Sequence, residues 1–440
     1  MATTQPRISG RTVREIAASI ERAISVGGLS PGDPLPSVRE LAAHLDVSPA
    51  TAASAYRILR DRAFIVTEQR RGTRVSERPA LGLRPPTTVP ADAVDLASGN
   101  PDPALLPSLT EAVRTLELPT HLYGEMAALP EFLETVKADI ALAGPAVEHA
   151  VVVAGGLDGI ERVHQVHARP GDAVAVEDPC YAGLLDLVRS LGMIPQPIAI
   201  DARGPLPKAT EAVLASGPTA IVVTPRAQNP TGATIDAERV AELRQVLARF
   251  PDLLVIESDH VGRISSAERF TTIEHRDRWA LVRSINKSLG PDLRLGVVAG
   301  DELTVSRVQG RQSVGCGWVS HVLQRLALQL WLDPEVEQLV SRATVAYRER
   351  RERLLAALAE RAIPATGTTG FNVWIPVPAE DAVIQALLAR NWVVRAGEPY
   401  RLESPPGIRV TTSTLAADEA LRFADDLARV LRPVHRPRLG

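Results

Sequence analysis

Residues 284–296 read SINKSLGPDLRLG, and this stretch does more than any other to decide the fold of the 440-residue chain. Its lysine, Lys287, is one of three in the chain, whereas arginine occurs 46 times (49 Lys plus Arg, minus three Lys). A retained lysine can do what a guanidinium cannot, which is to lose its proton and act as a nucleophilic amine. The alternative is that Lys287 is a surface lysine without a special role. The surrounding sequence has to decide between these two interpretations.

Apolar runs bounded by turn residues recur through the middle of the chain. They cover residues 150–155, 173–178, 220–225, 253–258, 280–285 and 295–300, and helical patterns separate most of them. Strands that are apolar on both faces and alternate with helices predict a mostly parallel sheet covered on both sides. Such a sheet binds ligands beyond the carboxyl ends of its strands, and Lys287 follows one of those ends.

The predicted strand ends carry a set of residue types that suits one ligand. A helix start with glycines offers backbone N–H groups to an anion, and an aromatic ring, an amide, a carboxylate, a lysine and an arginine accompany it. The residues concerned are Gly155, Gly156, Tyr181, Asn229, Asp259, Ser284, Lys287 and Arg294. Each alone also has a plainer explanation as a turn, cap or core residue. Together they suit pyridoxal phosphate, whose aldehyde condenses with a lysine amine.

From about residue 95 to the C-terminus the chain resembles fold-type I aminotransferases. The motifs that carry the resemblance are GLDG (156–159), EDPCYAG (177–183), QNPTG (228–232) and SINKSLGPDLRLG. The resemblance implies a large cofactor-binding part at about 120–310 and a smaller C-terminal α/β part at about 335–435. It also implies a role for each site residue. Lys287 would form the Schiff base with the cofactor, Asn229 would donate to the cofactor's phenolic oxygen, and Tyr181 would stack on its ring. The cofactor's phosphate would be held by Gly155, Gly156, Ser284 and Arg294, and Arg409 would bind a substrate carboxylate.

The chain departs from that family where a carboxylate should meet the pyridine nitrogen. The run is Glu257-Ser258-Asp259-His260, so Ser258 takes the position of the acid and His260 that of the usual tyrosine. A serine leaves the nitrogen mostly neutral, and we therefore expect transamination to be impaired. Asp259 could substitute only through a bulge or beyond the strand's end, because a one-residue shift turns a side chain to the opposite face.

Residues 8–78 predict a separate DNA-binding module. An amphipathic helix ends at Gly27-Gly28, and helices at 38–45 and from Ser48 to about Arg62 are joined by the turn Asp46-Val47. Two strands around residues 69–72 follow, which completes a winged helix-turn-helix. Residues 1–78 contain 12 Arg and 8 Asp plus Glu, which is a net charge of +4. The whole chain has a net charge of −3, so the remaining residues carry −3 − 4 = −7. The alternative to DNA binding is that residues 8–78 form a small helical domain whose arginines are only solvated.

This module resembles the winged-helix domain of GntR-type bacterial regulators. The resemblance implies that the following residues face DNA: Arg39, Ser48, Thr51, Tyr56, Arg70, Arg71 and Gly72. Pro49 stands where the family often has arginine; it suits a first helical turn but supplies no phosphate contact there. The proline-containing residues 79–94 read as an extended linker to the domain at 95–440.

The two resemblances together are the architecture of MocR-type regulators. That architecture implies a transcription factor that binds operator DNA, pyridoxal phosphate and an amine or amino-acid effector, and forms a head-to-tail homodimer. We favour this hypothesis over a regulator whose large domain has lost the cofactor, and over a working aminotransferase. Two cysteines argue against a disulfide framework or a zinc site, and we expect no metal. Without a membrane-spanning stretch or signal peptide, we expect a cytoplasmic protein.

Overall fold

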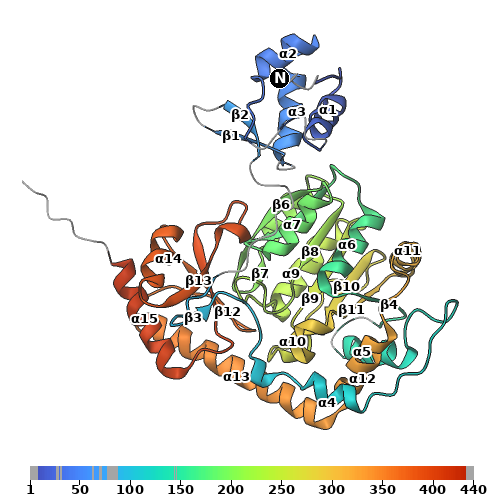
Figure 1. Ribbon diagram of the computed structural model, residues 1–440, viewed down its shortest axis with the longest axis vertical. Coiled ribbons are helices and arrows are strands. Elements are labelled where there is room, and N and C mark those ends of the chain that lie inside the picture. The colour runs from blue at the N-terminus through green and yellow to red at the C-terminus, as the bar shows by residue number, and fades with distance from the viewer. Residues whose placement is uncertain are drawn as a thin grey trace, which may run out of the picture. The chain divides into compact units, whose positions relative to one another are not determined.

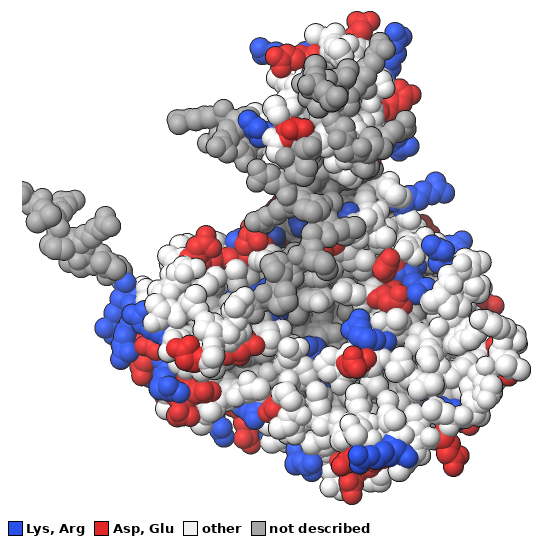
Figure 2. Space-filling view, viewed as in Figure 1, with Lys and Arg blue, Asp and Glu red and all other residues white. Residues whose placement is uncertain are grey.

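The computed structural model describes residues 8–25, 29, 32–61, 64–68, 72–76, 88–142, 144 and 146–432 (Figure 1). The chain divides into two compact units: the winged helix belongs to the first, and the second, which is the larger, contains most of the residues from Thr87 onward. None of the described helices is long and apolar enough to cross a membrane. On the face drawn in Figure 2, acidic and basic side chains are interspersed over the larger unit and do not gather by sign.

The winged helix consists of α1 (Val13–Ser25), α2 (Val38–Leu45) and α3 (Pro49–Asp61), followed by the antiparallel strands β1 (Ile65–Glu68) and β2 (Gly72–Val75). Ser37 begins α2 with a capping box, in which its hydroxyl accepts from Glu40 N and the Glu40 carboxylate accepts from Ser37 N. Asp46, in the left-handed conformation, ends α2. The predicted helix-turn-helix and strand pair are confirmed.

The larger unit is built on an eight-stranded sheet. Its strands are β4 (His149–Val153), β5 (Ala173–Asp178), β6 (Ile194–Asp201), β7 (Gly204–Pro205), β8 (Ala220–Val223), β9 (Leu254–Asp259), β10 (Trp279–Ser284) and β11 (Gly296–Gly300), in the order β4-β11-β10-β9-β8-β5-β6-β7. Neighbouring pairs from β10 through β9 and β8 to β5 are parallel. Strand β11 runs antiparallel to both of its neighbours. The predicted mostly parallel sheet is confirmed.

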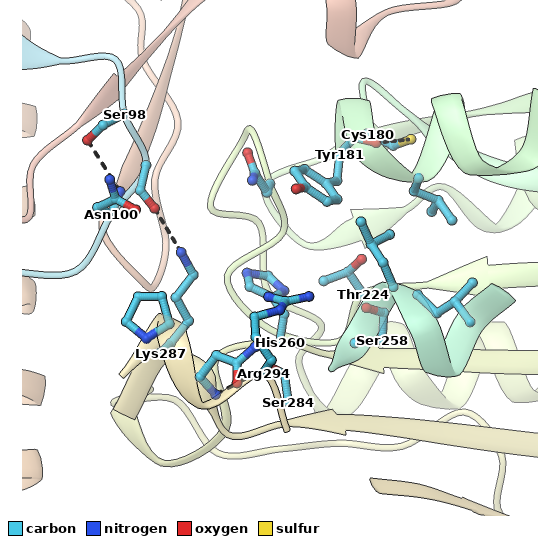
Figure 3. Close-up of a pocket in the computed structure, with 18 of the residues that line it drawn as sticks. Ser98, Asn100, Cys180, Tyr181, Thr224, Ser258, His260, Ser284, Lys287 and Arg294 are labelled. Carbon is cyan, nitrogen blue, oxygen red and sulfur yellow. Dashed lines mark hydrogen bonds between the residues drawn. The ribbon is translucent and has the colours of Figure 1, made fainter. Parts of the chain in front are cut away.

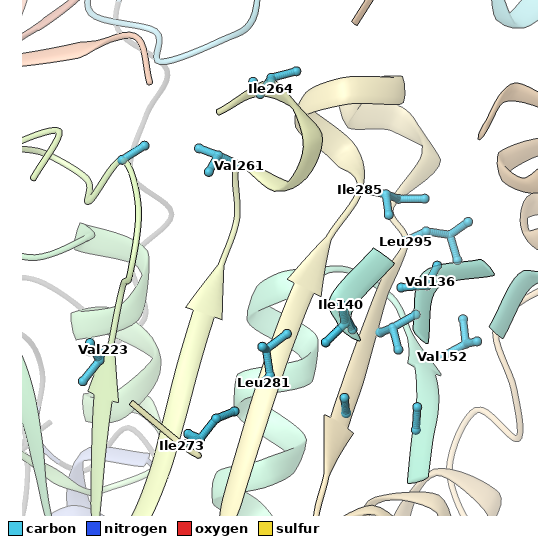
Figure 4. Packing of buried hydrophobic residues seen from close by; sticks show 14 of the residues in the cluster. Val136, Ile140, Val152, Val223, Val261, Ile264, Ile273, Leu281, Ile285 and Leu295 are labelled. Carbon is cyan, nitrogen blue, oxygen red and sulfur yellow. The ribbon is translucent and has the colours of Figure 1, made fainter. Parts of the chain in front are cut away.

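Helices cover both faces of this sheet. The helices between β3 (Val94–Leu96) and β12 (Asn372–Pro376) are α4 (Leu109–Arg114), α5 (Pro130–Ala141), α6 (Gly156–His167), α7 (Ala182–Ser190), α8 (Pro207–Leu214), α9 (Ala237–Ala248), α10 (Asn286–Leu289), α11 (Glu302–Ser313), α12 (His321–Leu332) and α13 (Pro334–Ala359). Gly159 of α6 approaches Val153 and Val282, whereas α5 packs in the cluster that contains Val152 and Leu281 (Figure 4). Adjacent residues of a strand face opposite sides, so α5 and α6 lie on opposite faces.

A second, four-stranded sheet forms the small part, in the order β12-β14-β13-β3. Its strands are β12 (Asn372–Pro376), β13 (Trp392–Ala396), β14 (Gly407–Thr411) and β3 (Val94–Leu96), and its core includes residues of α13, α14 (Glu380–Leu388) and α15 (Ala417–Leu431). Strand β3 pairs parallel with β13, although about 300 residues separate them in the chain. Strand β3 was not predicted from the sequence, and it leads directly into residues 97–100.

Candidate functional site

A cavity of about 340 Å³ lies at the carboxyl ends of the strands of the large sheet (Figure 3). Its lining includes nine of the residues singled out from the sequence: Gly156, Tyr181, Asn229, Ser258, His260, Ser284, Lys287, Arg294 and Arg409. Six polar or glycine residues that were not predicted from the sequence also line it: Ser98, Gly99, Asn100, Cys180, Thr224 and Asn286. Strand β14 of the small sheet contributes Arg409, so both sheets build the cavity.

Lys287 lies in α10, directly after β10, and its side chain points into the cavity (Figure 3). The Nζ atom donates a 2.8 Å hydrogen bond to the Gly99 carbonyl and lies 5.2 Å from the centroid of the Phe371 ring. Burial, helped by the positive charge of Arg409, lowers the pKa of Lys287 to about 8. The amine is therefore available as a nucleophile close to neutral pH.

The end of β4 and the start of α6 form a cradle for an anion. Gly155 has a φ of 104°, and a Cβ at this position would lie 3.0 Å from Nη2 of Arg294. The first turn of α6, which begins at Gly156, presents N–H groups that its own helix cannot satisfy. Ser284 lines the cavity beside it, 3.7 Å from where a Cβ of Gly156 would be. This combination of backbone donors and a guanidinium fits a phosphate group.

The alternation of β9 decides which residues of its end reach the cavity. Ser258 and His260 line it, whereas Asp259 faces the other side and is fully buried against Arg226 (2.9 Å) and Arg283 (3.3 Å). Burial alone would raise the pKa of Asp259, but these two arginines outweigh it and hold the pKa well below its usual range. Asp259 is therefore not a cavity residue, and its inclusion among the cofactor contacts is corrected.

His260 shares the cavity with Lys287 and is uncharged. Burial, and then the positive charge of Lys287, lowers the pKa of His260 to about 4. None of the residues found lining the cavity in the described part of the chain is acidic. The described lining therefore offers no carboxylate to a ligand.

The winged helix places the predicted DNA-contacting residues in two groups. Arg39, Ser48 and Gly72 are exposed, Thr51 is partly so, and the Ser48 hydroxyl accepts from Thr51 N (3.1 Å) at the start of α3. Tyr56 is only 3% exposed and donates a 2.6 Å hydrogen bond to the Pro36 carbonyl. Burial raises the pKa of Tyr56 far above its usual value. Tyr56 is thus a core residue, and its assignment to DNA is corrected. The predicted contacts Arg70 and Arg71 lie outside the described residues.

Comparisons with known proteins match both units. Residues 91–427 match the family described as aminotransferase class I and II, and residues 12–75 match the bacterial regulatory proteins of the gntR family. The chain belongs to the aminotransferase class I and II family. Its combination of this family with a GntR-type domain confirms the predicted MocR-type organisation. The matches indicate a DNA-binding transcriptional regulator whose aminotransferase-like domain binds pyridoxal phosphate.

Relatives of this family member include regulators that match nearly its whole length. The vitamin B6 salvage pathway transcriptional repressor PtsJ of Salmonella typhimurium is 36% identical over 430 residues, which cover 96% of this chain and 99% of the relative. The HTH-type transcriptional regulator TauR of Rhodobacter capsulatus is 27% identical over 447 residues, 90% of each chain. Among solved structures, an archaeal alanine:glyoxylate aminotransferase shares the fold, with a TM-score of 0.70 and 23% identity over 77% of this chain and 90% of that one.

Proposed function

We propose that this protein is a cytoplasmic, homodimeric transcriptional regulator that uses pyridoxal phosphate to sense a small amine or amino acid. One observation carries the proposal: β9 turns Ser258, and not Asp259, into the cavity that contains Lys287. The site retains the residues that would hold the cofactor, but it lacks the carboxylate that would keep the pyridine nitrogen protonated. Such a site binds and exchanges amines more readily than it completes a transamination cycle.

The residues of the cavity fit the cofactor group by group. Lys287 would bind the aldehyde, and the phosphate would take the cradle at Gly155, Gly156, Ser284 and Arg294. Asn229 and Tyr181 would contact the ring. When bound, the cofactor supplies an aldehyde carbon for which other amines can compete. Lys287 provides a mostly protonated amine at neutral pH, with its pKa at about 8, and the Gly99 carbonyl orients that amine.

Arg409 supports an effector that carries a carboxylate. Arg409 is 4% exposed and lines the cavity, and it makes no ion pair with another described residue. A buried guanidinium without a counter-ion favours an anionic ligand. An amino acid would therefore place its amine at the cofactor's aldehyde, in place of Lys287, and its carboxylate at Arg409.

A second candidate is that the cofactor itself is the signal. The Salmonella relative is named for a vitamin B6 salvage pathway, and it matches this chain over 96% of its length. The absence of acidic residues from the described cavity lining favours this candidate as well, because binding of the cofactor needs no carboxylate at the ring nitrogen. Under either candidate, the ligand changes the protein's affinity for DNA only if it binds two conformations of the protein with different affinities.

The experiment that tests the proposal measures DNA binding with and without the cofactor. Fluorescently labelled duplexes from the region upstream of the protein's own gene would be titrated with cofactor-free protein, with pyridoxal phosphate added, and with amino acids added to both. We expect the cofactor or an amino acid to shift the DNA affinity of the wild type but not that of Lys287→Ala. Arg39→Ala is the control for specific DNA contact. Identical responses by the wild type and Lys287→Ala would refute the proposal.

A further inference from the structure

Three acceptors hold the Arg409 guanidinium, which lines the cavity. Nη1 donates a 2.7 Å hydrogen bond to the Tyr400 hydroxyl, and Nη2 donates to the Ala97 carbonyl. Nη1 also donates a longer hydrogen bond, of 3.4 Å, to Asn229 Oδ1, and the buried Nε has no hydrogen-bond partner in the described structure. These acceptors set the orientation of the planar group, and the two shorter bonds, to Tyr400 and Ala97, do most to determine which N–H groups a ligand meets.

Tyr400 is itself held by the cofactor-binding part. It belongs to a short helical turn, Glu398–Tyr400, and its carbonyl accepts a 2.8 Å hydrogen bond from Cys180 N, next to Tyr181 in the chain. The segment 398–404, called here the 398–404 loop, continues from this turn toward β14. Tyr400 therefore connects Arg409 to the segment that carries the expected ring-stacking residue.

Two buried carboxylates, those of Asp178 and Glu380, hold the 398–404 loop. Asp178, at the end of β5, accepts from the backbone N–H groups of Leu402 (2.9 Å), Glu403 (2.7 Å) and Ser404 (2.7 Å). Glu380, at the start of α14, accepts from Glu398 N (2.7 Å) and pairs with Arg401. Charge-assisted bonds of this kind are stronger than neutral ones, so the loop holds Tyr400 in one place.

We propose that Tyr400 is the positioning residue for Arg409 and that it makes the site selective for ligands with a carboxylate beside the amine. This inference rests on the proposed function, because it takes Arg409 as the residue that binds the carboxylate. Tyr400 acts through the guanidinium and not on the ligand's amine or on the cofactor. Its removal should change the affinity for amino acids and leave the affinity for the corresponding amines unchanged.

The test compares amino acids with their decarboxylated amines. Protein loaded with pyridoxal phosphate would be titrated with the common L-amino acids and, for the one that binds most tightly, with its own amine, by absorbance. In Tyr400→Phe we expect the Kd of the amino acid to rise about tenfold, as for a lost hydrogen bond to a charged group. The Kd values of the amine and of the cofactor should stay within about twofold, because neither contact involves Arg409. Tyr56→Phe, which removes another buried hydroxyl, is the matched control.

A second variant separates the loop from the hydroxyl. Asp178→Asn leaves Tyr400 intact but weakens the hold on the 398–404 loop, and we expect it to weaken amino-acid binding in the same selective way. Equal losses for the amino acid and its amine, or no loss in Tyr400→Phe, would overturn the inference. So would a wild type that binds no amino acid more tightly than its amine. A wild type that takes up no cofactor would instead refute the proposed function, and this inference with it.

Discussion

The lowered pKa of Lys287 makes cofactor uptake depend on pH in a defined way. Only the neutral amine attacks an aldehyde. With a pKa of about 8 in place of 10.5, the neutral fraction at pH 7 is about one in eleven and not about one in three thousand, a gain of roughly 300-fold. Burial is the main cause and Arg409 the second. The rate of uptake should therefore rise about tenfold per pH unit below pH 8 and level off above it.

The assay is the rate of absorbance change when cofactor-free protein meets excess pyridoxal phosphate, from about pH 6.5 to 9.5. The control is Lys287→Ala, which keeps Lys137 and Lys208 and therefore measures how much cofactor the other lysine amines take up. Arg409→Gln removes one of the two causes, so the midpoint should move to higher pH. A rate that is flat across this range, or that still rises steeply at its upper end, would refute the reasoning about burial.

Three further predictions follow from individual side chains. Ser258→Asp places a carboxylate in the cavity, and the rate of half-transamination with amino acids, followed by absorbance, should rise at least about tenfold; an unchanged rate would contradict the role given to Ser258. Tyr56→Phe should lower the free energy of unfolding of the winged helix, measured in urea, by about 1 kcal/mol and leave the DNA affinity of the folded protein unchanged. A variant that loses DNA affinity but keeps its full stability would show that Tyr56 contacts DNA. Asp259→Asn leaves Arg226 and Arg283 without their buried partner and should cost about 3 kcal/mol or more of stability in the larger unit; a cofactor spectrum altered at unchanged stability would place Asp259 in the site.

Local signals in the sequence predicted much of the fold. Helix α2 begins after Ser37 and ends before Asp46, as its capping and turn residues indicate. Strand alternation likewise predicted that Ser258 and Asp259 face opposite sides. The same kind of signal would have corrected Tyr56, since it shares a helical face with the buried Ala52 and Leu59.

Other parts of the site depend on contacts between distant segments. The Gly99 carbonyl that accepts from Lys287 lies 188 positions away in the chain. Tyr400 reaches Arg409 because the 398–404 loop is tied to Asp178, more than 200 positions earlier. Gly99 and Tyr400 lie in no motif and no periodic pattern, so no sequence signal could have identified them as site residues. The pairing of β3 with β13 brings Gly99 to the cavity, and the hydrogen bonds to Asp178 hold Tyr400 beside Arg409.

The most direct test of the central claim is the absorbance spectrum of the purified protein during titration with pyridoxal phosphate. If Lys287 binds the cofactor, the wild type develops a stoichiometric band in the near-ultraviolet to visible region, and Lys287→Ala does not. A wild type that stays colourless with the cofactor added, or a Lys287→Ala variant with the same band, would contradict the account.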